Sequence, residues 1–126
     1  MKRLTATLAA LTLIAALPTT THATTGTCTQ YEHLLTIYAP RGGWNIPRMS
    51  RYMWRESRCQ PHVRSRTRDS GLLQINDINL AYLTTRLGRR ITPATLMNPT
   101  TNIQAAAQLC IYARRAWGNC YQPWGR

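Results

Sequence analysis

Apolar residues recur every three or four positions in several stretches of the chain, which is the spacing of one face of a helix. The first stretch predicts a helix over about residues 29–38, and we expect Pro40 and Gly42-Gly43 to end it. A second helix is predicted to begin after Asn45, a good N-cap residue, with Pro47 in its first turn, where a missing N–H costs nothing.

The second predicted helix carries an acidic residue on its apolar side. The apolar positions are Ile46, Met49, Tyr52 and Met53. Glu56 continues the same stripe at a step of three to four residues. The other side carries Arg48, Arg51, Arg55 and Arg58. We therefore expect Glu56 to face apolar neighbours, whereas the arginines point elsewhere.

The rest of the chain predicts two more helices and a small hairpin. Residues 57–70 are polar and arginine-rich, which indicates an exposed loop, and the short apolar run 72–75 indicates a strand or hairpin edge. Helices are predicted over 78–87, and over about 100–117 with Gly118 as its stop. The inward positions of the last helix are Ile103, Ala106, Ala107, Cys110, Ile111, Ala113 and Trp117. Hence one mainly helical domain with at most a minor sheet is expected.

The N-terminal residues are typical of a secretory signal peptide. Lys2 and Arg3 precede an apolar run over 4–17, and Ala23 ends a small-residue cleavage site. We expect cleavage there, which leaves residues 24–126 as the mature, extracytoplasmic domain. A retained anchor is the alternative, but the apolar run is short for a bilayer span and no second candidate follows, so no integral membrane segment is expected.

The four cysteines fall in the mature part, and an even number in an exported chain predicts two disulfides. We favour Cys59–Cys110 with Cys28–Cys120; the rival is Cys28–Cys59 with Cys110–Cys120. Zinc is a competing use, because His62 follows Cys59 at a ligand spacing. No second pair of ligands completes such a site, so no metal is expected.

The chain has a formal net charge of +12 and only four acidic residues. Lys2 is the only lysine, so arginine supplies all the mature cations. Anionic cell-wall polymers, acidic glycans and lipid head groups are the partners that this charge favours in an exported protein. Charge alone would also suit nucleic acid, but no aromatic–basic platform or known binding motif is recognisable, so a nucleic-acid module is only a rival hypothesis.

Glu56 is the first candidate for chemistry. A carboxyl held against apolar side chains loses hydration, which raises its pKa and suits it to donate a proton to a glycosidic oxygen. The alternative is that Glu56 pairs with Arg55 or Arg58, as surface carboxylates commonly do.

Three motifs together resemble the soluble lytic transglycosylase and goose-type lysozyme group. They are Glu56-Ser57 followed by Pro61; the run Gly71-Leu72-Leu73-Gln74-Ile75-Asn76; and Asn102-Ile103 leading an alanine-rich helix to Tyr112 and a later Pro123-Trp124. The stretch from Asp69 to Asn76 also resembles chicken-type lysozymes. The likeness covers about residues 45–124.

The resemblance implies a mainly α (α+β) lysozyme-like fold, a helical domain in which a small β-hairpin flanks a substrate cleft. It implies a monomer without cofactors that cleaves peptidoglycan between N-acetylmuramic acid and N-acetylglucosamine. Glu56 matches the catalytic acid, and Gln74 and Asn76 match polar contacts to sugar. Ser57 would hold the catalytic loop, and Gly71 would let the backbone approach the glycan closely.

Two departures from the family pattern leave the product open. The Ala-Tyr-Asn motif of the transglycosylases is not evident, and Tyr112 or Tyr121 is its candidate substitute. Asp69 is a carboxylate that typical transglycosylases lack at this place. It could stabilise an oxocarbenium-like transition state or act on water, which would give hydrolysis; otherwise the substrate's own hydroxyl attacks and an anhydro-sugar results. The alternative for Asp69 is pairing with Arg66 or Arg68.

Three tryptophans have predicted positions. Trp54 and Trp117, on predicted helices, are expected in the core, whereas Trp124 in the irregular tail is a candidate for stacking on sugar. A cationic protein that binds wall or membrane without catalysis, on the same fold, is the alternative function.

Overall fold

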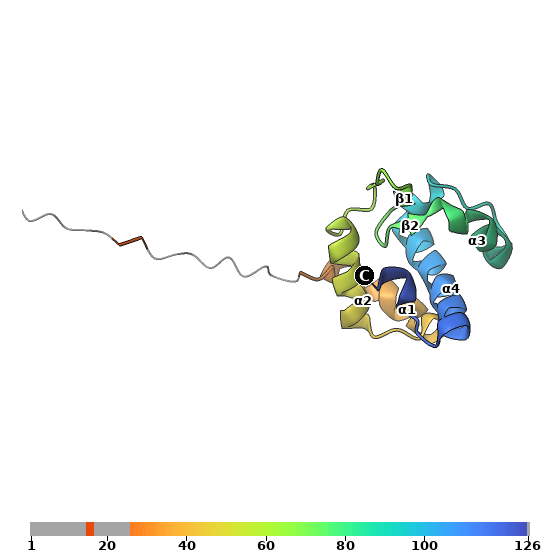
Figure 1. The fold of residues 1–126 in the computed structure, drawn as a ribbon, viewed down its shortest axis with the longest axis horizontal. Helices are drawn as coiled ribbons and strands as arrows, with labels where there is room; N and C mark the ends of the chain where they lie inside the picture. The colour runs from red at the N-terminus through yellow and green to blue at the C-terminus, as the bar shows by residue number, and fades with distance from the viewer. Residues whose placement is uncertain (1–14, 17–25, 126) are drawn as a thin grey trace, which may run out of the picture.

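A computed structural model describes residues 15–16 and 26–125 (Figure 1). The predicted signal peptide, residues 1–23, lies outside the described residues except for positions 15 and 16. The α-helices are α1 (Glu32–Gly42), α2 (Ile46–Ser57), α3 (Leu80–Leu87) and α4 (Pro99–Trp117). The strands are β1 (Asp69–Ser70) and β2 (Ile75–Asn76). Short 3₁₀ helices are η1 (Thr29–Tyr31), η2 (Asp77–Asn79), η3 (Thr95–Met97) and η4 (Gln122–Trp124).

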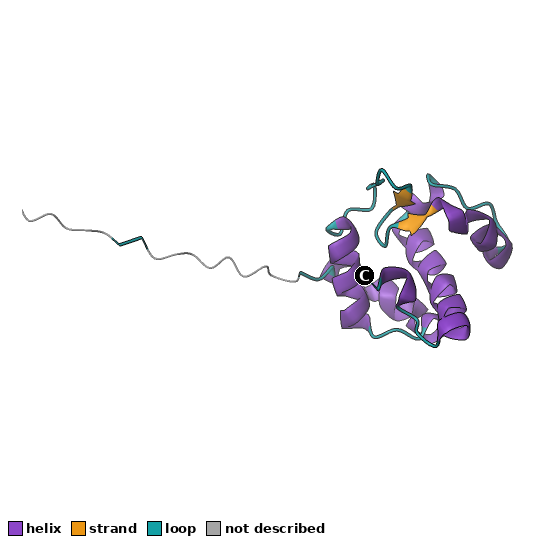
Figure 2. Ribbon diagram, in the orientation of Figure 1, coloured by secondary structure: helices purple, strands orange, loops and turns teal. Residues whose placement is uncertain are grey.

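The predicted mainly helical architecture with a minor sheet is confirmed (Figure 2). The Asn45 side chain accepts a hydrogen bond from the Arg48 N–H at 3.0 Å, so it caps α2 as predicted. Pro40 does not end α1, which continues to Gly42. The helix ends at the predicted glycine pair, where the left-handed φ of 70° at Gly43 turns the chain and lets its N–H reach the Ala39 carbonyl.

The hairpin is shorter than predicted and lies at one edge of the domain, above α4 in the view of Figure 1. Its register pairs Asp69 with Asn76 and Ser70 with Ile75. Residues 71–74, predicted as mostly strand, form the turn between the strands. The reason is that Leu72 and Leu73 point into the core, where both are fully buried.

A buried asparagine connects the hairpin to α4. The Asn102 Nδ2 donates to the carbonyls of Ser70 at 2.9 Å and Leu96 at 3.0 Å, and its Oδ1 accepts from the Leu73 N–H at 2.9 Å. The side chain is fully buried and all three partners are backbone groups. Asn102 therefore satisfies hairpin groups that would otherwise be desolvated without a partner.

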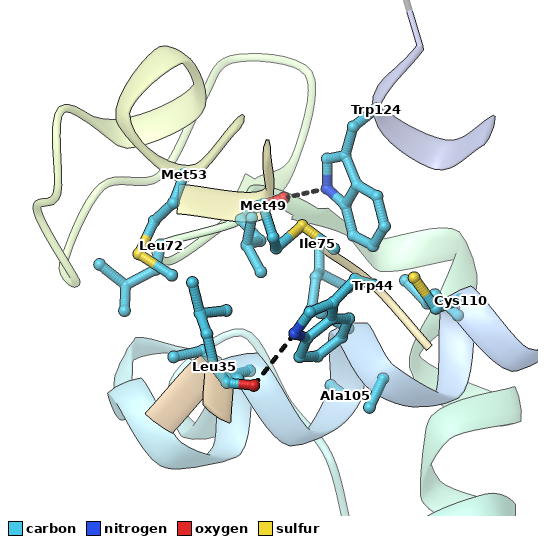
Figure 3. Packing of buried hydrophobic residues seen from close by; sticks show 14 of the residues in the cluster. Leu35, Trp44, Met49, Met53, Leu72, Ile75, Ala105, Cys110 and Trp124 are labelled. Carbon is cyan, nitrogen blue, oxygen red and sulfur yellow. Dashed lines mark hydrogen bonds between the residues drawn. The ribbon is translucent and has the colours of Figure 1, made fainter. Parts of the chain in front are cut away.

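Two tryptophans lie in the core with their indole N–H groups satisfied (Figure 3). Trp44 donates to the Leu35 carbonyl at 3.0 Å, and Trp124 donates to the Leu73 carbonyl at 2.8 Å. Trp117, predicted to point inward, is 57% exposed, so that prediction was wrong. The buried positions of α4 end at Ala113, and Trp117 occupies the last turn before Gly118 stops the helix.

The favoured disulfide pairing is wrong, and the rival is correct: Cys28 is bonded to Cys59 and Cys110 to Cys120. The chain reverses at Gly118, whose φ is 70°, and this brings Cys120 back alongside α4. Cys28 in turn lies against α2, because its N–H donates to the buried Ser50 hydroxyl at 2.8 Å. The zinc alternative fails, because Cys59 is in a disulfide.

None of the helices in the described ranges is both long and apolar enough to cross a bilayer.

Candidate active site

Glu56 lies near the C-terminal end of α2, on the stripe predicted from sequence. Met53 and Met49, one and two turns earlier, are fully buried, and the Glu56 side chain is 13% exposed. The Glu56 side chain is therefore mostly shielded from solvent. α2 reaches this point because Asn45 and Pro47 start the helix and its buried methionines hold it on the core.

The predicted alternative for Glu56, an ion pair with a neighbouring arginine, is also present. The Arg55 Nη2 lies 2.8 Å from the Glu56 Oε1, and the Arg55 Nε donates to the same oxygen at 3.3 Å. The Arg55 Nη2 also donates to the backbone carbonyl of Trp124. Arg55 therefore connects the carboxyl to the C-terminal segment of the domain.

Asp69 lies on β1 with 7% of its surface exposed. Its Oδ2 accepts hydrogen bonds from the hydroxyls of Ser65, at 2.7 Å, and Thr67, and its Oδ1 accepts from the Asn76 Nδ2 at 3.0 Å. The backbone N–H of Asp69 donates to the Ser65 hydroxyl oxygen at 3.0 Å. These contacts make Asp69 the centre around which the loop before the hairpin is ordered.

The other predicted sugar contacts on the hairpin also have partners within the protein. The Gln74 Nε2 donates to the carbonyls of Val63 at 3.1 Å and Gly71 at 2.9 Å. The Asn76 Nδ2 donates to the Thr67 carbonyl at 2.9 Å, and its Oδ1 accepts from the Ile78 N–H at 3.0 Å. Both side chains therefore shape the hairpin and lie at its surface.

A charged cluster stabilises the same loop from outside. Arg64 makes two contacts with the Asp77 carboxylate, at 3.0 and 2.8 Å, and the Arg68 Nε lies 3.1 Å from it. The hydrogen bond from Arg64 holds the pKa of Asp77 below its ordinary value, and the same bond raises the pKa of Arg64. Arg68, predicted as a partner of Asp69, thus has Asp77 as its ion-pair partner.

A groove begins at the hairpin and continues to an aromatic cluster. Its first hollow, of about 210 Å³, is lined by Asp69, Gln74, Ile75, Asn76, Asn79, Leu109, Pro123 and Trp124. A second hollow, of about 280 Å³, shares three of these residues with the first, namely Asn79, Leu109 and Pro123, and adds Tyr112, Trp117 and Gln122. The two hollows are therefore adjacent, and we call them together the groove, with a polar end at the hairpin and an aromatic end at α4.

The aromatic end is built from α3 and α4. The Tyr112 ring lies edge-on to Tyr82 and to Trp117, with centroid distances of 5.5 Å in both cases. Tyr112 is 48% exposed, as befits its predicted contact with substrate, and Trp117 is more exposed still. Trp117, Tyr82 and Asn79 were missed from sequence. Only the position of Trp117 directly before the Gly118 stop could have indicated exposure, because a side chain there has no following turn to cover it.

Two predicted site residues, Trp124 and Ser57, are almost wholly enclosed by the protein. Trp124 is 3% exposed, so its ring has no free face on which a sugar could stack, and that prediction is not retained. The Ser57 hydroxyl is buried and donates to the Met53 carbonyl at 3.1 Å, while its own carbonyl accepts from the Gln60 N–H at 3.1 Å. Ser57 therefore fixes the start of the loop that follows α2.

Gly71 is required by close packing within the chain, and not by approach to a glycan. Its φ is 78°, and a Cβ there would lie 2.2 Å from the Asn102 Nδ2 and 2.3 Å from the Leu96 carbonyl oxygen. A side chain at this position would therefore displace the asparagine that anchors the hairpin.

Trp124 is among the residues that line the first hollow, and its carbonyl accepts a hydrogen bond from Arg55, which pairs with Glu56. The described residues include no group of three histidine, cysteine or acidic side chains that could hold a metal ion.

Comparison with known proteins identifies one family. The model of the transglycosylase SLT domain matches residues 49–121, more than half of the 126-residue chain. The matched span begins within α2, includes Glu56 and the hairpin, and ends at Tyr121. No curated protein and no solved structure matches the chain significantly.

Proposed function

Because this chain belongs to the transglycosylase SLT domain family, we propose that it is an exported enzyme that cleaves the glycan strands of peptidoglycan. The bond is the β-1,4 linkage between N-acetylmuramic acid and N-acetylglucosamine, and Glu56 acts as general acid and then as base. One observation supports this assignment most strongly. A shielded carboxyl in the matched span is linked through Arg55 and Trp124 to a groove lined by polar and aromatic side chains.

In the first step Glu56 gives its proton to the glycosidic oxygen. The bond from that oxygen to the anomeric carbon breaks, the leaving sugar departs with a new hydroxyl, and positive charge develops on the anomeric carbon. In the second step the Glu56 carboxylate removes a proton from a nucleophilic hydroxyl, which attacks the anomeric carbon. Glu56 is then protonated again, so the cycle closes without a cofactor.

The nucleophile decides the product. Attack by the muramic acid's own hydroxyl gives an anhydro-sugar, whereas attack by water gives a reducing end. Three hydrogen bonds from Ser65, Thr67 and Asn76 already engage the two oxygens of Asp69. We therefore assign Asp69 to ordering the hairpin beside the groove, and we propose the anhydro-sugar as the product.

The groove offers two kinds of contact that a glycan needs. Asparagine and glutamine side chains at the hairpin end can bind hydroxyl and acetamido groups, while the exposed faces of Tyr112 and Trp117 can pack against the C–H faces of sugar rings. We propose that a glycan strand lies across Asn79 and Leu109 between these two ends.

The wider setting is an extracytoplasmic monomer at the cell wall. Two disulfides suit an oxidising compartment. The net charge of +12, which becomes +10 when Lys2 and Arg3 leave with the signal peptide, favours accumulation on anionic wall polymers. Secretion through the predicted signal peptide belongs to the same proposal.

Mass spectrometry of purified sacculi digested with the protein tests this function. We expect soluble muropeptides with anhydro-muramic acid ends. Reducing muramic acid ends would replace transglycosylation by hydrolysis. Intact sacculi, with protein bound to them, would favour the non-catalytic wall-binding alternative, for which the positive charge is the supporting observation.

A further inference from the structure

The outer face of α2 carries arginine side chains layered on aromatic rings. The Arg48 guanidinium lies 3.9 Å from the ring centroid of Tyr121, and that of Arg58 lies 3.6 Å from the Trp54 ring. An open hollow of about 270 Å³ on this face is lined by Arg48, Arg51, Tyr52, Trp54 and Arg55. We call Arg48, Arg51 and Arg58, with Trp54 and Tyr121, the α2 cationic face.

No carboxylate of residues 26–125 forms an ion pair with the arginines of this face. Within the described part of the chain the ion pairs are Arg55–Glu56, Arg64–Asp77 and Arg68–Asp77. None of them involves the three arginines of the α2 cationic face, all of which are exposed. Three full charges are therefore presented to solvent along one helix.

Stacking prepares two of these guanidinium groups for an anion. A guanidinium that lies over a ring can keep N–H groups at its planar edge free, and its long side chain loses less freedom when a ligand binds. In Arg48, Nη2 donates to the Tyr52 hydroxyl at 3.3 Å, which also holds the guanidinium in place. The planar edge can donate two parallel hydrogen bonds to a phosphate, which gives geometric fit as well as charge. Arg48 lies in the first turn of α2, and Arg58 is the C-cap residue directly after its last turn, so the two lie at opposite ends of the helix. One extended polymer could contact the whole row.

We propose that the α2 cationic face binds a phosphodiester polyanion of the cell wall, a polymer with repeated phosphate groups. The choice of a wall polymer rests on the proposed function, because α2 also carries Glu56 at its end and would be held beside the glycan that it cleaves. A membrane surface fits less well. The rings of this face lie under guanidinium groups, while strongly exposed apolar residues such as Ile37 and Ile78 lie on α1 and η2.

This face corrects an expectation from sequence, where no aromatic–basic platform was recognisable. Tyr121 is 73 positions from Arg48 in the chain, so only the fold could bring them together. The contact is fixed by the Tyr121 hydroxyl, which accepts from the N–H of Asn45 at 2.7 Å, directly before α2.

Binding of soluble inorganic polyphosphate, measured at several salt concentrations, tests the proposal. The variant Arg48→Gln/Arg51→Gln/Arg58→Gln is compared with Arg89→Gln/Arg90→Gln/Arg115→Gln, which removes the same charge from exposed arginines elsewhere. We expect the first variant to raise Kd at least tenfold and the control to raise it less than threefold. The slope of log Kd against log salt concentration should be smaller by about two in the first variant. Each of the three lost arginine–phosphate contacts contributes about 0.7 to this slope.

Arg48→Lys/Arg51→Lys/Arg58→Lys serves as a second variant, and decides the question if the glutamine variant does not fold. It keeps the charge and loses the planar fork, so we expect Kd to rise about threefold. The proposal would be overturned if Kd rose equally in the two glutamine variants, or if Kd were unchanged in the lysine variant. Either result would show that binding depends only on the net charge of the protein.

The source of the phosphate is tested with the Glu56→Gln protein, which does not digest the wall in the course of the measurement. We expect it to bind phosphate-bearing walls more tightly than walls stripped of phosphodiester polymers, and more tightly than vesicles of equal phosphatidylglycerol and phosphatidylcholine or duplex DNA. Tighter binding to vesicles or to DNA would overturn the proposal. If the unaltered protein releases nothing from stripped walls, the proposed function fails, and the polyphosphate result remains a separate measurement.

Discussion

The carboxylate of Glu56 lies 2.8 Å from the guanidinium of Arg55, and this guanidinium also binds the carbonyl of Trp124. Trp124 is also among the residues that line the hollow beside Asp69. A single arginine therefore fixes the end of α2 to the segment beside the groove. We infer that Arg55 is a positioning residue, which holds the carboxyl of Glu56 in the direction that the proposed chemistry needs.

Replacing Arg55 by glutamine tests this positioning role. We expect kcat to fall about ten- to a hundredfold while KM changes little, because small misplacement of a catalytic group is costly. The free energy of unfolding should change by less than about 1 kcal/mol, since the Arg55 side chain is largely exposed. Arg55→Lys should recover part of the rate. A variant with unchanged kcat, or one whose only change is lower stability, would show that the ion pair has no part in catalysis.

The exposed aromatic residues at the far end of the groove should determine affinity for long glycans. Trp117→Ala and Tyr112→Ala each remove a ring face from the second hollow, which we expect to raise KM two- to tenfold, corresponding to about 0.5–1.5 kcal/mol of aromatic packing. Ile37→Ala is the matched control, because Ile37 is 62% exposed on α1 and does not line either hollow. The measurement is KM for glycan strands of different length. An equal rise of KM in the Ile37→Ala control would show that the aromatic end of the groove does not bind glycan.

Low pH should loosen the hairpin before it unfolds the rest of the domain. The pKa of Asp77 is lowered from its ordinary value of 3.8, chiefly by the hydrogen bond from Arg64. Its stabilising contribution is therefore complete above about pH 4 and disappears as the pH falls through the lower, folded pKa. Amide exchange of residues 64–77 should accelerate below pH 4. In Asp77→Asn exchange should already be faster at pH 6, and less dependent on acid; an identical pH profile for the two proteins would disprove the link.

The two disulfides should differ in their effect on stability. Cys28–Cys59 spans 31 residues and Cys110–Cys120 spans 10. In the chain-entropy model the losses on removing them are about 4 and about 3 kcal/mol. Urea unfolding of Cys28→Ser/Cys59→Ser and Cys110→Ser/Cys120→Ser measures both losses. Peptide mapping without reduction checks the pairing, and a fragment that joins Cys59 to Cys110 would contradict it.

Local patterns predicted most of the fold, because each depends on neighbours in the chain. The N-cap at Asn45, the stop at Gly118 and the burial of Met49, Met53 and Glu56 follow from helical spacing and capping. The lysozyme-like fold class and the family were predicted from motif order and are confirmed.

What sequence could not predict depends on contacts between distant segments. The disulfide pairing was wrong because it requires knowing that the chain turns back after α4. Trp124 was assigned to the surface because nothing local shows that its indole reaches the Leu73 carbonyl. Gly71 was assigned to glycan contact, although the neighbour that excludes a side chain is Asn102, 31 positions later.

The most direct test compares the rate of muropeptide release by Glu56→Gln with that of Glu32→Gln. Both changes remove one carboxylate from a helix, and Glu32 lies in the first turn of α1. We expect the rate of Glu56→Gln to fall by a factor of about 10²–10⁴ while the protein keeps its fold, because the proton donor is gone. The Glu32→Gln protein should keep its rate within twofold. Equal rates in the two variants would contradict the assignment of Glu56 as the catalytic acid.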